Sequence, residues 1–347
     1  RRVVTGDRAT DWTQVAKLTA DDTAAGDEFG YSVSIDGDTM VIGAYGDDDN
    51  GSASGSAYVF RRSTVNDRAS GWTQVAKLTA ADGAGGDRFG VSVAIDGDTV
   101  VIGAHLDDDD TMGSNSGSAY VFRRITAGDI TSGWAQVAKL IADDGAAEYW
   151  FGISVAINGD TLVIGARNED NTGVNSGSAY VFTRDTGGDL ASDWTQIAKL
   201  TADDGAAGDD YGYSIAINGD TILIGAYADD DKGIDSGAAY VFRRNTAGDL
   251  SSNWTQVAKL TADDGAAGDY FGIAVSIDGD TVVVGANMDD DKGSNSGAGY
   301  VFERNTAGDL SSDWTQVAKL TADDGAPNDY FGRSVSVDGS TVAIGAW

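Results

Sequence analysis

The chain has 347 residues, 41% of them hydrophobic, and its 23 basic and 55 acidic residues give a formal net charge of −32. Such a charge repels nucleic acid and anionic membranes and favours cations or cationic partners, and no apolar run approaches the roughly 18 residues that a membrane-spanning helix needs. The absence of cysteine removes disulfides and thiolate chemistry, and a single histidine, His105, leaves little material for zinc sites or imidazole catalysis.

A tryptophan-headed segment, "WTQVAKLT" or a close variant, recurs along the whole chain. Its copies are separated by 60, 62, 60, 60 and 60 residues and begin at Trp12, Trp72, Trp134, Trp194, Trp254 and Trp314. We interpret these tryptophans as packing residues of one strand, because a ligand site would not need the same context in every copy. A fixed period of this length indicates a repeat architecture.

Each repeat contains four short runs with strand composition, bounded by Gly, Asp, Asn or Ser. In the unit from Trp254 to Asp313 the runs are "WTQVAKLT", "IAVSID", "TVVVGA" and "GAGYVFER". An Asp-Gly or Asn-Gly pair joins the second run to the third, which predicts a tight hairpin with a type I′ turn. Since no segment has a helical period, we predict an all-β fold, a β-propeller of four-stranded antiparallel blades with six repeats visible.

Three short motifs recur in every complete unit: "FG", as in Phe271-Gly272, then "IGA" or "VGA", then "AYVF" or a close variant. This pattern resembles the FG-GAP repeat of integrin α subunits and of bacterial or archaeal surface proteins. The resemblance implies a propeller in which the "FG" run is the inner strand and the "WTQVAKL" run the outer strand. The calcium loop of that family lies between the first two strands, where this chain has a two-residue turn, so those ligands cannot be transferred.

The strand count leaves the last blade incomplete. There are six copies of the "WTQ", "FG" and "IGA" runs but five "AYVF" runs. The segment from Trp12 to Thr19 is a candidate outer strand for the last blade, although that blade would keep unpaired edges. We expect residues 1–347 to form a single propeller domain cut from a longer chain, in which a seventh blade is an open alternative.

The loops after the "IGA" runs, such as "ADDDKGIDSG", are rich in aspartate. Alternate oxygen side chains around a glycine suit a hard cation, which predicts several Ca²⁺ sites. The predicted ligands are Asp47, Asp49, Asp107, Asp109, Glu169, Asn171, Asn175, Asp229, Asp231, Asp235, Asp289, Asp291 and Asn295. The alternative is that these are solvated turns whose side chains cap their own backbones.

Positions that vary between otherwise similar repeats lie beside the "FG" and "GA" motifs, at the predicted mouth of the central channel. Aromatic and arginine side chains that converge there are typical of recognition surfaces, and the alternative is free drift of exposed positions. The candidate ligand-binding residues are Tyr45, His105, Trp150, Arg167, Tyr227, Tyr270, Asn287, Tyr330 and Arg333.

These features favour an extracellular or cell-surface binding or adhesion module with calcium-stabilised loops and a protein or glycan ligand at its acidic face. The alternative is a structural building block of a surface layer or filament that associates with itself. An enzyme acting on polysaccharides is less favoured, and we predict no catalytic residues, because the single histidine and the repeated carboxylates form no recognisable catalytic set.

Overall fold

The computed structural model describes residues 14–67, 70–109, 111–187 and 193–347. In these residues all regular structure is β-strand. The described part of the chain has no helix that could cross a membrane.

The strands form five four-stranded antiparallel sheets and one two-stranded sheet, in chain order. Blade 1 contains β1 (Ser32–Asp36), β2 (Thr39–Ala44), β3 (Ser56–Arg62) and β4 (Trp72–Leu78). Blade 2 contains β5 (Ser92–Asp96), β6 (Thr99–Ala104), β7 (Ser118–Arg124) and β8 (Trp134–Leu140). Blade 3 contains β9 (Phe151–Asn158), β10 (Thr161–Ala166), β11 (Ser178–Arg184) and β12 (Trp194–Leu200).

The remaining strands repeat this plan. Blade 4 contains β13 (Ser214–Asn218), β14 (Thr221–Ala226), β15 (Ala238–Arg244) and β16 (Trp254–Leu260). Blade 5 contains β17 (Phe271–Asp278), β18 (Thr281–Ala286), β19 (Ala298–Arg304) and β20 (Trp314–Leu320). Blade 6 contains β21 (Ser334–Asp338) and β22 (Thr341–Gly345).

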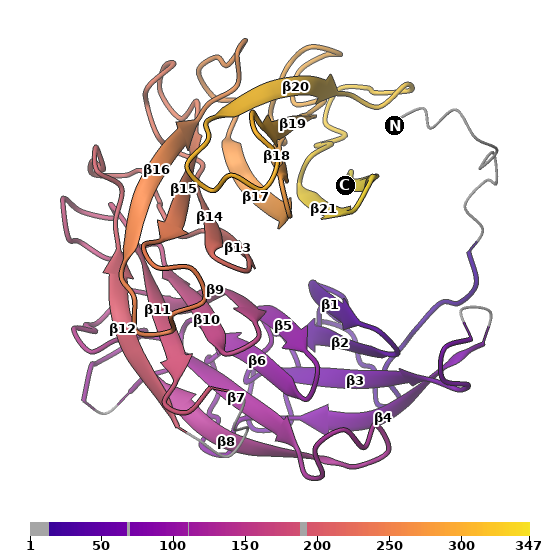
Figure 1. The fold of residues 1–347 in the computed structure, drawn as a ribbon. Coiled ribbons are helices and arrows are strands. Elements are labelled where there is room, and N and C mark those ends of the chain that lie inside the picture. The colour runs from indigo at the N-terminus through magenta and orange to yellow at the C-terminus, as the bar shows by residue number, and fades with distance from the viewer. Residues whose placement is uncertain (1–13, 68–69, 110, 188–192) are drawn as a thin grey trace.

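The blades surround a central axis, with the first strand of each blade innermost and the fourth at the rim (Figure 1). The predicted propeller architecture and the order of strands within a blade are therefore confirmed. In Figure 1 the described residues form an arc, with a gap between blade 6 and blade 1. The first strands of consecutive blades pack against one another along the arc.

The candidate outer strand for the last blade does not form in the described residues. Trp12 lies outside them, and residues 14–20 have no strand structure. Leu18 and Ala20 instead pack against the core of blade 1, beside Tyr58. Blade 6 is consequently a β21–β22 hairpin.

The predicted hairpins between the first and second strands are confirmed, but their turn type was wrong. In blade 1, Asp36 pairs with Thr39 across the two loop residues Gly37 and Asp38. Gly37 has a φ of 54°, whereas Asp38 is not among the residues of positive φ. A type I′ turn needs positive φ at both loop residues, so the glycine-first loop matches type II′.

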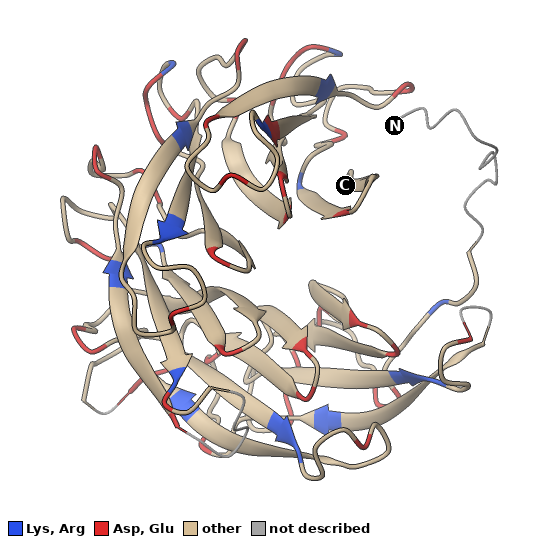
Figure 2. Cartoon of the chain, viewed as in Figure 1, with Lys and Arg blue, Asp and Glu red and all other residues tan. Residues whose placement is uncertain are grey.

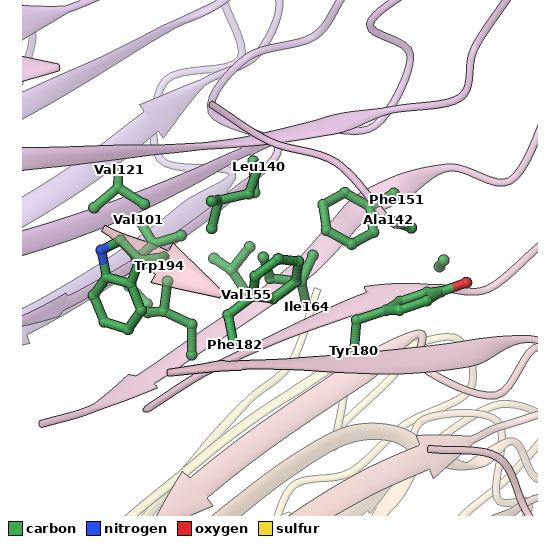
Figure 3. Close-up of a cluster of buried hydrophobic side chains, with 14 residues drawn as sticks. Val101, Val121, Leu140, Ala142, Phe151, Val155, Ile164, Tyr180, Phe182 and Trp194 are labelled. Carbon is green, nitrogen blue, oxygen red and sulfur yellow. The ribbon is translucent and has the colours of Figure 1, made fainter. Parts of the chain in front are cut away.

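The hydrophobic core consists of clusters between neighbouring blades, because each strand points alternate residues to its two faces. Val101 of β6 packs with Phe151 and Ile164 of blade 3, while Val100 and Ile102 pack on the opposite side of the same strand. Figure 3 shows the cluster between blades 2 and 3, where Phe151 lies near Tyr180 and Phe182. The two-sided burial explains the continuous apolar runs of the second strands.

The "FG" and "GA" glycines meet where one blade touches the next. A Cβ atom on Gly225 would lie 2.0 Å from the carbonyl oxygen of Gly272 in the following blade. The same carbonyl accepts a hydrogen bond of 2.8 Å from Ser214 Oγ. Equivalent approaches join Gly43 to Gly90, Gly103 to Gly152, Gly165 to Gly212 and Gly285 to Gly332.

The repeated tryptophans begin the outer strands, as predicted, from Trp72 onward. Each lies under the guanidinium of the arginine with which it pairs in the third strand, and Arg244 Cζ is 4.5 Å from the Trp254 ring centroid. The same arginine forms an ion pair of 2.8 Å with Asp220. This stack fixes the end of the outer strand that lies opposite the acidic loops.

We predict that Gly225→Ala destabilises the protein, because the new methyl group would overlap the Gly272 carbonyl. Overpacking of this kind costs about 1–3 kcal/mol, and denaturant unfolding would measure it. The control is Gly71→Ala, where the nearest atom to a new Cβ is Ser63 Oγ at 3.7 Å. Equal stability of the two variants would show that the close contact between blades is dispensable.

Candidate functional site

Two sets of loops share one face of the ring, namely the loops after the "IGA" runs and the loops that lead from one blade into the next. Main-chain hydrogen bonds join the loop between β2 and β3 to the loop that leads into β5, from Gly86 N to Ser52 O and from Arg88 N to Ala53 O. Figure 2 shows acidic residues in the loops around the ring and basic residues mainly on the strands. We call the surface of these two loop sets the acidic face.

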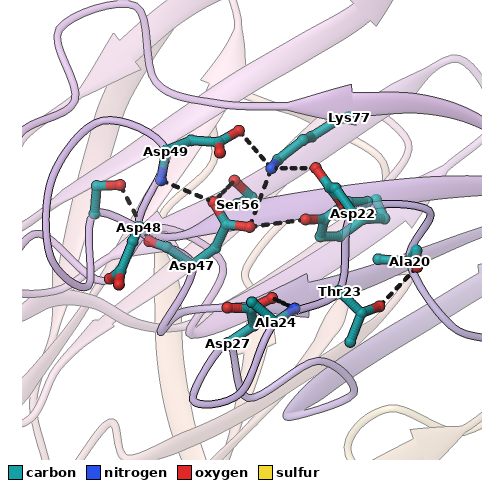
Figure 4. Close-up of polar contacts among 12 residues, drawn as sticks. Ala20, Asp22, Thr23, Ala24, Asp27, Asp47, Asp48, Asp49, Ser56 and Lys77 are labelled. Atoms are coloured by element: carbon teal, nitrogen blue, oxygen red, sulfur yellow. Dashed lines mark hydrogen bonds and ion pairs between the residues drawn. The ribbon is translucent and has the colours of Figure 1, made fainter.

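A lysine from the outer strand reaches the acidic face and binds its carboxylates. Lys77 Nζ lies 3.0 Å from Asp47 Oδ2, 2.5 Å from Asp49 Oδ2 and 2.7 Å from Asp22 Oδ2. Asp47 is 3% exposed, and its carboxylate also accepts hydrogen bonds from the hydroxyls of Ser56 and Tyr58 and from the main-chain N–H of Asp49. Figure 4 shows the amine between the three carboxylates.

The same arrangement recurs in blades 2 to 5. Each lysine joins the aspartate at the fourth position of the inter-blade "TADD" segment or its variant to the first acidic residue of the loop after the "IGA" run. These sets are Lys139 with Asp82 and Asp107, Lys199 with Asp144 and Glu169, Lys259 with Asp204 and Asp229, and Lys319 with Asp264 and Asp289. Asp231 and Asp291 also contact their lysines, at 2.5 and 2.6 Å, and Asp109 is more distant at 3.8 Å.

The charges in each set stabilise one another. The hydrogen bond from Lys77 lowers the pKa of Asp22, although burial opposes the shift. Burial alone would lower the pKa of Lys77, but hydrogen bonds to Asp22 and Asp49 outweigh it and raise that pKa. Both groups are therefore ionised over the physiological range.

The third predicted metal ligand, present in three of the loops, makes structural contacts through its main chain. Asp235, Asn175 and Asn295 have left-handed backbones, with φ of 56°, 56° and 55°. Asp235 N donates to Asp230 Oδ1, and its carbonyl accepts from Tyr270 N at 3.2 Å. Asn171 donates its main-chain N–H to Glu169. The carbonyls of Asn175, Asp235 and Asn295 tie their loops to the neighbouring blade, whereas the Asn171 bond lies within its own loop.

The arrangement fits an ammonium ion better than Ca²⁺. Calcium takes six to eight oxygen ligands at about 2.3–2.6 Å, and here Lys77 Nζ already lies among the carboxylates. Within the described ranges, the group of three acidic residues with ligand atoms all within 4.8 Å is Asp22, Asp47 and Asp49, the same set that binds Lys77. Calcium would need Lys77 to leave, so calcium binding stays a prediction.

The variable positions converge at the centre of the ring, as predicted. A cavity of about 340 Å³ is lined by the residue after "FG" from all six repeats, with two residues from blade 6. The lining residues are Tyr31, Val91, Ile153, Tyr213, Ile273, Arg333, Ser334 and Trp347. We call this cavity and the variable positions around it the channel mouth.

Contacts between variable positions join neighbouring blades into a belt around the channel mouth. The Tyr227 ring packs on Tyr213 of its own blade and on Tyr270 of the next, with centroid distances of 4.8 and 5.2 Å. Arg167 Cζ lies 4.5 Å from the Trp150 ring centroid and 5.4 Å from that of Tyr213. On the blade 1 side, Tyr45 contacts Tyr31 and Arg88.

Two arginines of the belt differ in their pairing. Arg167 Nη1 lies 3.6 Å from Asp210 Oδ2 and donates to the Tyr227 hydroxyl, which itself bonds Asp210. Arg333 reaches across from blade 6, and both of its Nη atoms lie 3.3 Å from the Tyr213 hydroxyl. Arg333 has no carboxylate partner in the part of the chain that the structure describes.

Two predicted ligand-binding residues are buried beneath the belt. His105 is 4% exposed and Asn287 is 6% exposed. Burial lowers the pKa of His105 to about 3, with the charges of Arg88 and Arg167 adding to the effect, so its imidazole is neutral. His105 packs against the Trp150 ring at 5.3 Å and supports it from below.

The residue before each "FG" pair has a backbone that usually requires glycine. All six are non-glycine residues of positive φ, with values from 51° to 59° at Glu28, Arg88, Trp150, Asp210, Tyr270 and Tyr330. A left-handed conformation costs roughly 1–2 kcal/mol for an L-residue. The side chain at this position is therefore kept at some cost in stability.

Sequence reasoning missed the lysines of the acidic face. Each "WTQVAKL" copy has a lysine at the same place, in a chain with few basic residues, and that recurrence was the available signal. The candidate ligand set also left out Tyr213, although Tyr213 belongs to the variable column that follows the "FG" pairs. Asp264 was not among the predicted ligands, and it belongs to the Lys319 set.

The fold, the acidic face and the channel mouth define the protein as a repeat β-propeller. Its acidic loops are bridged by lysines, and the residues at its channel mouth vary from blade to blade. The FG-GAP repeat model matches residues 12–60, 72–122, 134–182, 194–242, 254–302 and 314–347. The chain therefore belongs to the FG-GAP repeat family. A search of curated proteins found no match.

We predict that Lys77→Met makes the protein more responsive to calcium than the parent. Removing the ammonium leaves three clustered carboxylates without their counterion, which calcium can then neutralise. Calorimetric melting with calcium and with chelator should show a larger rise in melting temperature for the variant.

The control for this comparison is Lys232→Met, which also removes one lysine. Lys232 is an exposed residue in the loop between β14 and β15 of blade 4. The response of this variant to calcium should equal that of the parent. Identical responses of all three proteins would show that Lys77 and calcium do not share a site.

We predict that ionisation of the buried Asp269 carboxyl group lowers the free energy of unfolding as pH rises from about 4 to 6. Burial raises the pKa of Asp269 from 3.8 to about 6, although the Ala266 N–H bonds its carboxylate. Between these values the folded state binds more protons than the unfolded state, so stability falls with increasing pH. Asp269→Asn keeps an acceptor for the N–H and should flatten the pH dependence of urea unfolding; an unchanged slope would contradict the assignment.

Proposed function

We propose that this protein is a binding module of the adhesion type, whose ligand contacts the channel mouth. The observation that supports the proposal is the belt of aromatic and arginine side chains, which varies from blade to blade on an otherwise nearly uniform scaffold. Aromatic and arginine residues dominate the energetics of protein recognition surfaces. A cavity of about 340 Å³ lies at the small end of ligand pockets.

The backbone strain at the channel mouth supports the same conclusion. Trp150, Tyr270 and Tyr330 keep bulky side chains at left-handed positions that glycine would occupy at lower cost. Strained residues that persist cluster at functional sites. Packing does not require this arrangement in every blade, because the equivalent residue of blade 1 is the exposed Glu28.

FG-GAP repeats are typical of extracellular proteins, and we propose an extracellular or cell-surface location with a protein or glycan ligand. Calcium binding to the acidic loops remains part of the proposal, with calcium competing against the outer-strand lysines for the loop carboxylates. No catalytic role is proposed, since the one histidine is buried and the repeated carboxylates are bound by lysines.

A second candidate function is self-association as a structural building block. It is supported by the face of blade 1 that no preceding blade covers in the described residues. Val33 and Ile35 are 63% and 54% exposed, whereas the equivalent Val93 and Ile95 of blade 2 are 8% and 7% exposed. This apolar face has the same composition as the faces that bind a neighbouring blade elsewhere in the ring.

We predict that Tyr213→Leu and Arg167→Met each weaken ligand binding roughly tenfold or more, the usual effect of losing an aromatic or arginine anchor. The measurement is binding of labelled protein to arrays of glycans and of extracellular proteins. Melting temperatures should stay close to that of the parent, because neither residue belongs to the clusters between blades.

The control variant is again Lys232→Met, which should bind like the parent. Binding that is unaffected by both channel-mouth variants would contradict the proposed site. Sedimentation of the same samples distinguishes self-association from ligand binding. Self-association predicts a particle mass that rises with protein concentration, and the Val33→Asp variant should have a lower mass than the parent.

A further inference from the structure

We propose that the channel mouth binds a sugar residue that bears a carboxylate group, with Arg333 as the residue that binds the carboxylate. The inference rests on the proposed binding function and names the chemistry of the ligand. It starts from Arg333, the cationic residue in the lining of the cavity.

Arg333 differs in charge from the residues at the equivalent position of the other blades. The residue after "FG" is tyrosine, valine or isoleucine in the other five repeats. A guanidinium placed among these side chains loses water, and it is expensive to bury without a counterion. Among the residues that the structure describes, Arg333 nonetheless bonds the phenol of Tyr213, an uncharged group, and no carboxylate.

Other arginines on the strands of this protein form close ion pairs with aspartates. Arg124, Arg244 and Arg304 each have a carboxylate oxygen within 2.8–2.9 Å. With 55 acidic residues in the chain, an aspartate beside Arg333 would be an ordinary arrangement. The planar guanidinium is instead left with capacity for a bidentate bond, the geometry that recognises carboxylates.

Neighbouring groups hold Arg333 and its partner in place. Arg167 lies over the Tyr213 ring while Arg333 bonds the Tyr213 hydroxyl, so the phenol is fixed between two cations. The 18 positions of the three variable columns include three arginines, Arg88, Arg167 and Arg333, and two acidic residues, Glu28 and Asp210. These 18 positions therefore carry a small net positive charge within a strongly acidic protein.

The surroundings of Arg333 favour a carboxylated sugar over other anions. The lining residues include Tyr31 and Tyr213, which carry hydroxyl groups, and Trp347, which is 82% exposed; hydroxyl groups and an aromatic ring match the hydroxyls and the apolar ring face of a sugar. A polyanion would be repelled by the acidic face that surrounds the mouth. A single carboxylate at the end of a glycan meets only the local cationic group.

The test is isothermal titration calorimetry of the intact protein with glucuronate and with glucose, which have the same ring and differ in the carboxylate. Glucuronate should bind at least tenfold more tightly than glucose, because hydrogen bonds between charged groups are the stronger kind. Arg333→Met should remove this preference, and Arg333→Lys should retain part of it. Lys232→Met is the charge-matched control and should keep the preference.

A short acidic peptide forms the third arm of the experiment. Binding of the peptide in an Arg333-dependent manner, without binding of glucuronate, would overturn the sugar and leave the proposed binding function standing. Equal affinities for glucuronate and glucose would overturn the role of Arg333. If array binding persists and depends on Tyr213 while glucuronate does not bind, the ligand class is wrong; if no array ligand depends on the channel mouth, the proposed function itself fails.

Discussion

The close approach of a backbone carbonyl to a glycine of the preceding blade is the constraint on which the rest of the structure depends. Gly272 O lies against Gly225 with no room for a side chain between them, so the distance between two blades is set by main-chain atoms. The serine bond to the same carbonyl, as from Ser214, orients the contact. Because the approach of glycine to carbonyl recurs in successive pairs of blades, apolar clusters of similar composition form between them.

The acidic face follows from the same regular spacing. Each blade brings its two acidic loops and the end of its outer strand to one place, so a lysine at one position of the repeat can neutralise carboxylates from both loops. The arrangement supplies the positive charge from within the chain. A bound cation would neutralise the same carboxylates, and the side chain of Lys259 and a metal ion would compete for Asp229 and Asp231.

The sequence predicts the fold well because its strongest signals are local and repeated. The period of the tryptophans, the "FG" and "GA" pairs and the hairpin turns each determine one blade, and Trp254 lies on the outer strand where its motif places it. The cation of the acidic face was not predictable in the same way. Alternate carboxylates specify an affinity for positive charge, but whether that charge is Ca²⁺ or Lys259 depends on which strand end reaches the loop, and this is a tertiary fact.

For the channel mouth, the sequence predicted the location of the site but not the burial or the pairing of its side chains. Variation between repeats located it, since columns that differ among near-identical copies stand out in a single sequence. Variation between repeats did not reveal how deeply each side chain is buried. His105 and Asn287 were therefore grouped with exposed residues, although both are buried. Nor did it reveal pairing: Arg167 and Arg333 look alike in sequence, yet one bonds Asp210 and the other a phenol. Only the curvature of the ring, which brings blade 6 within reach of blade 4, distinguishes an arginine that is paired with a carboxylate from one that is bonded to a phenol.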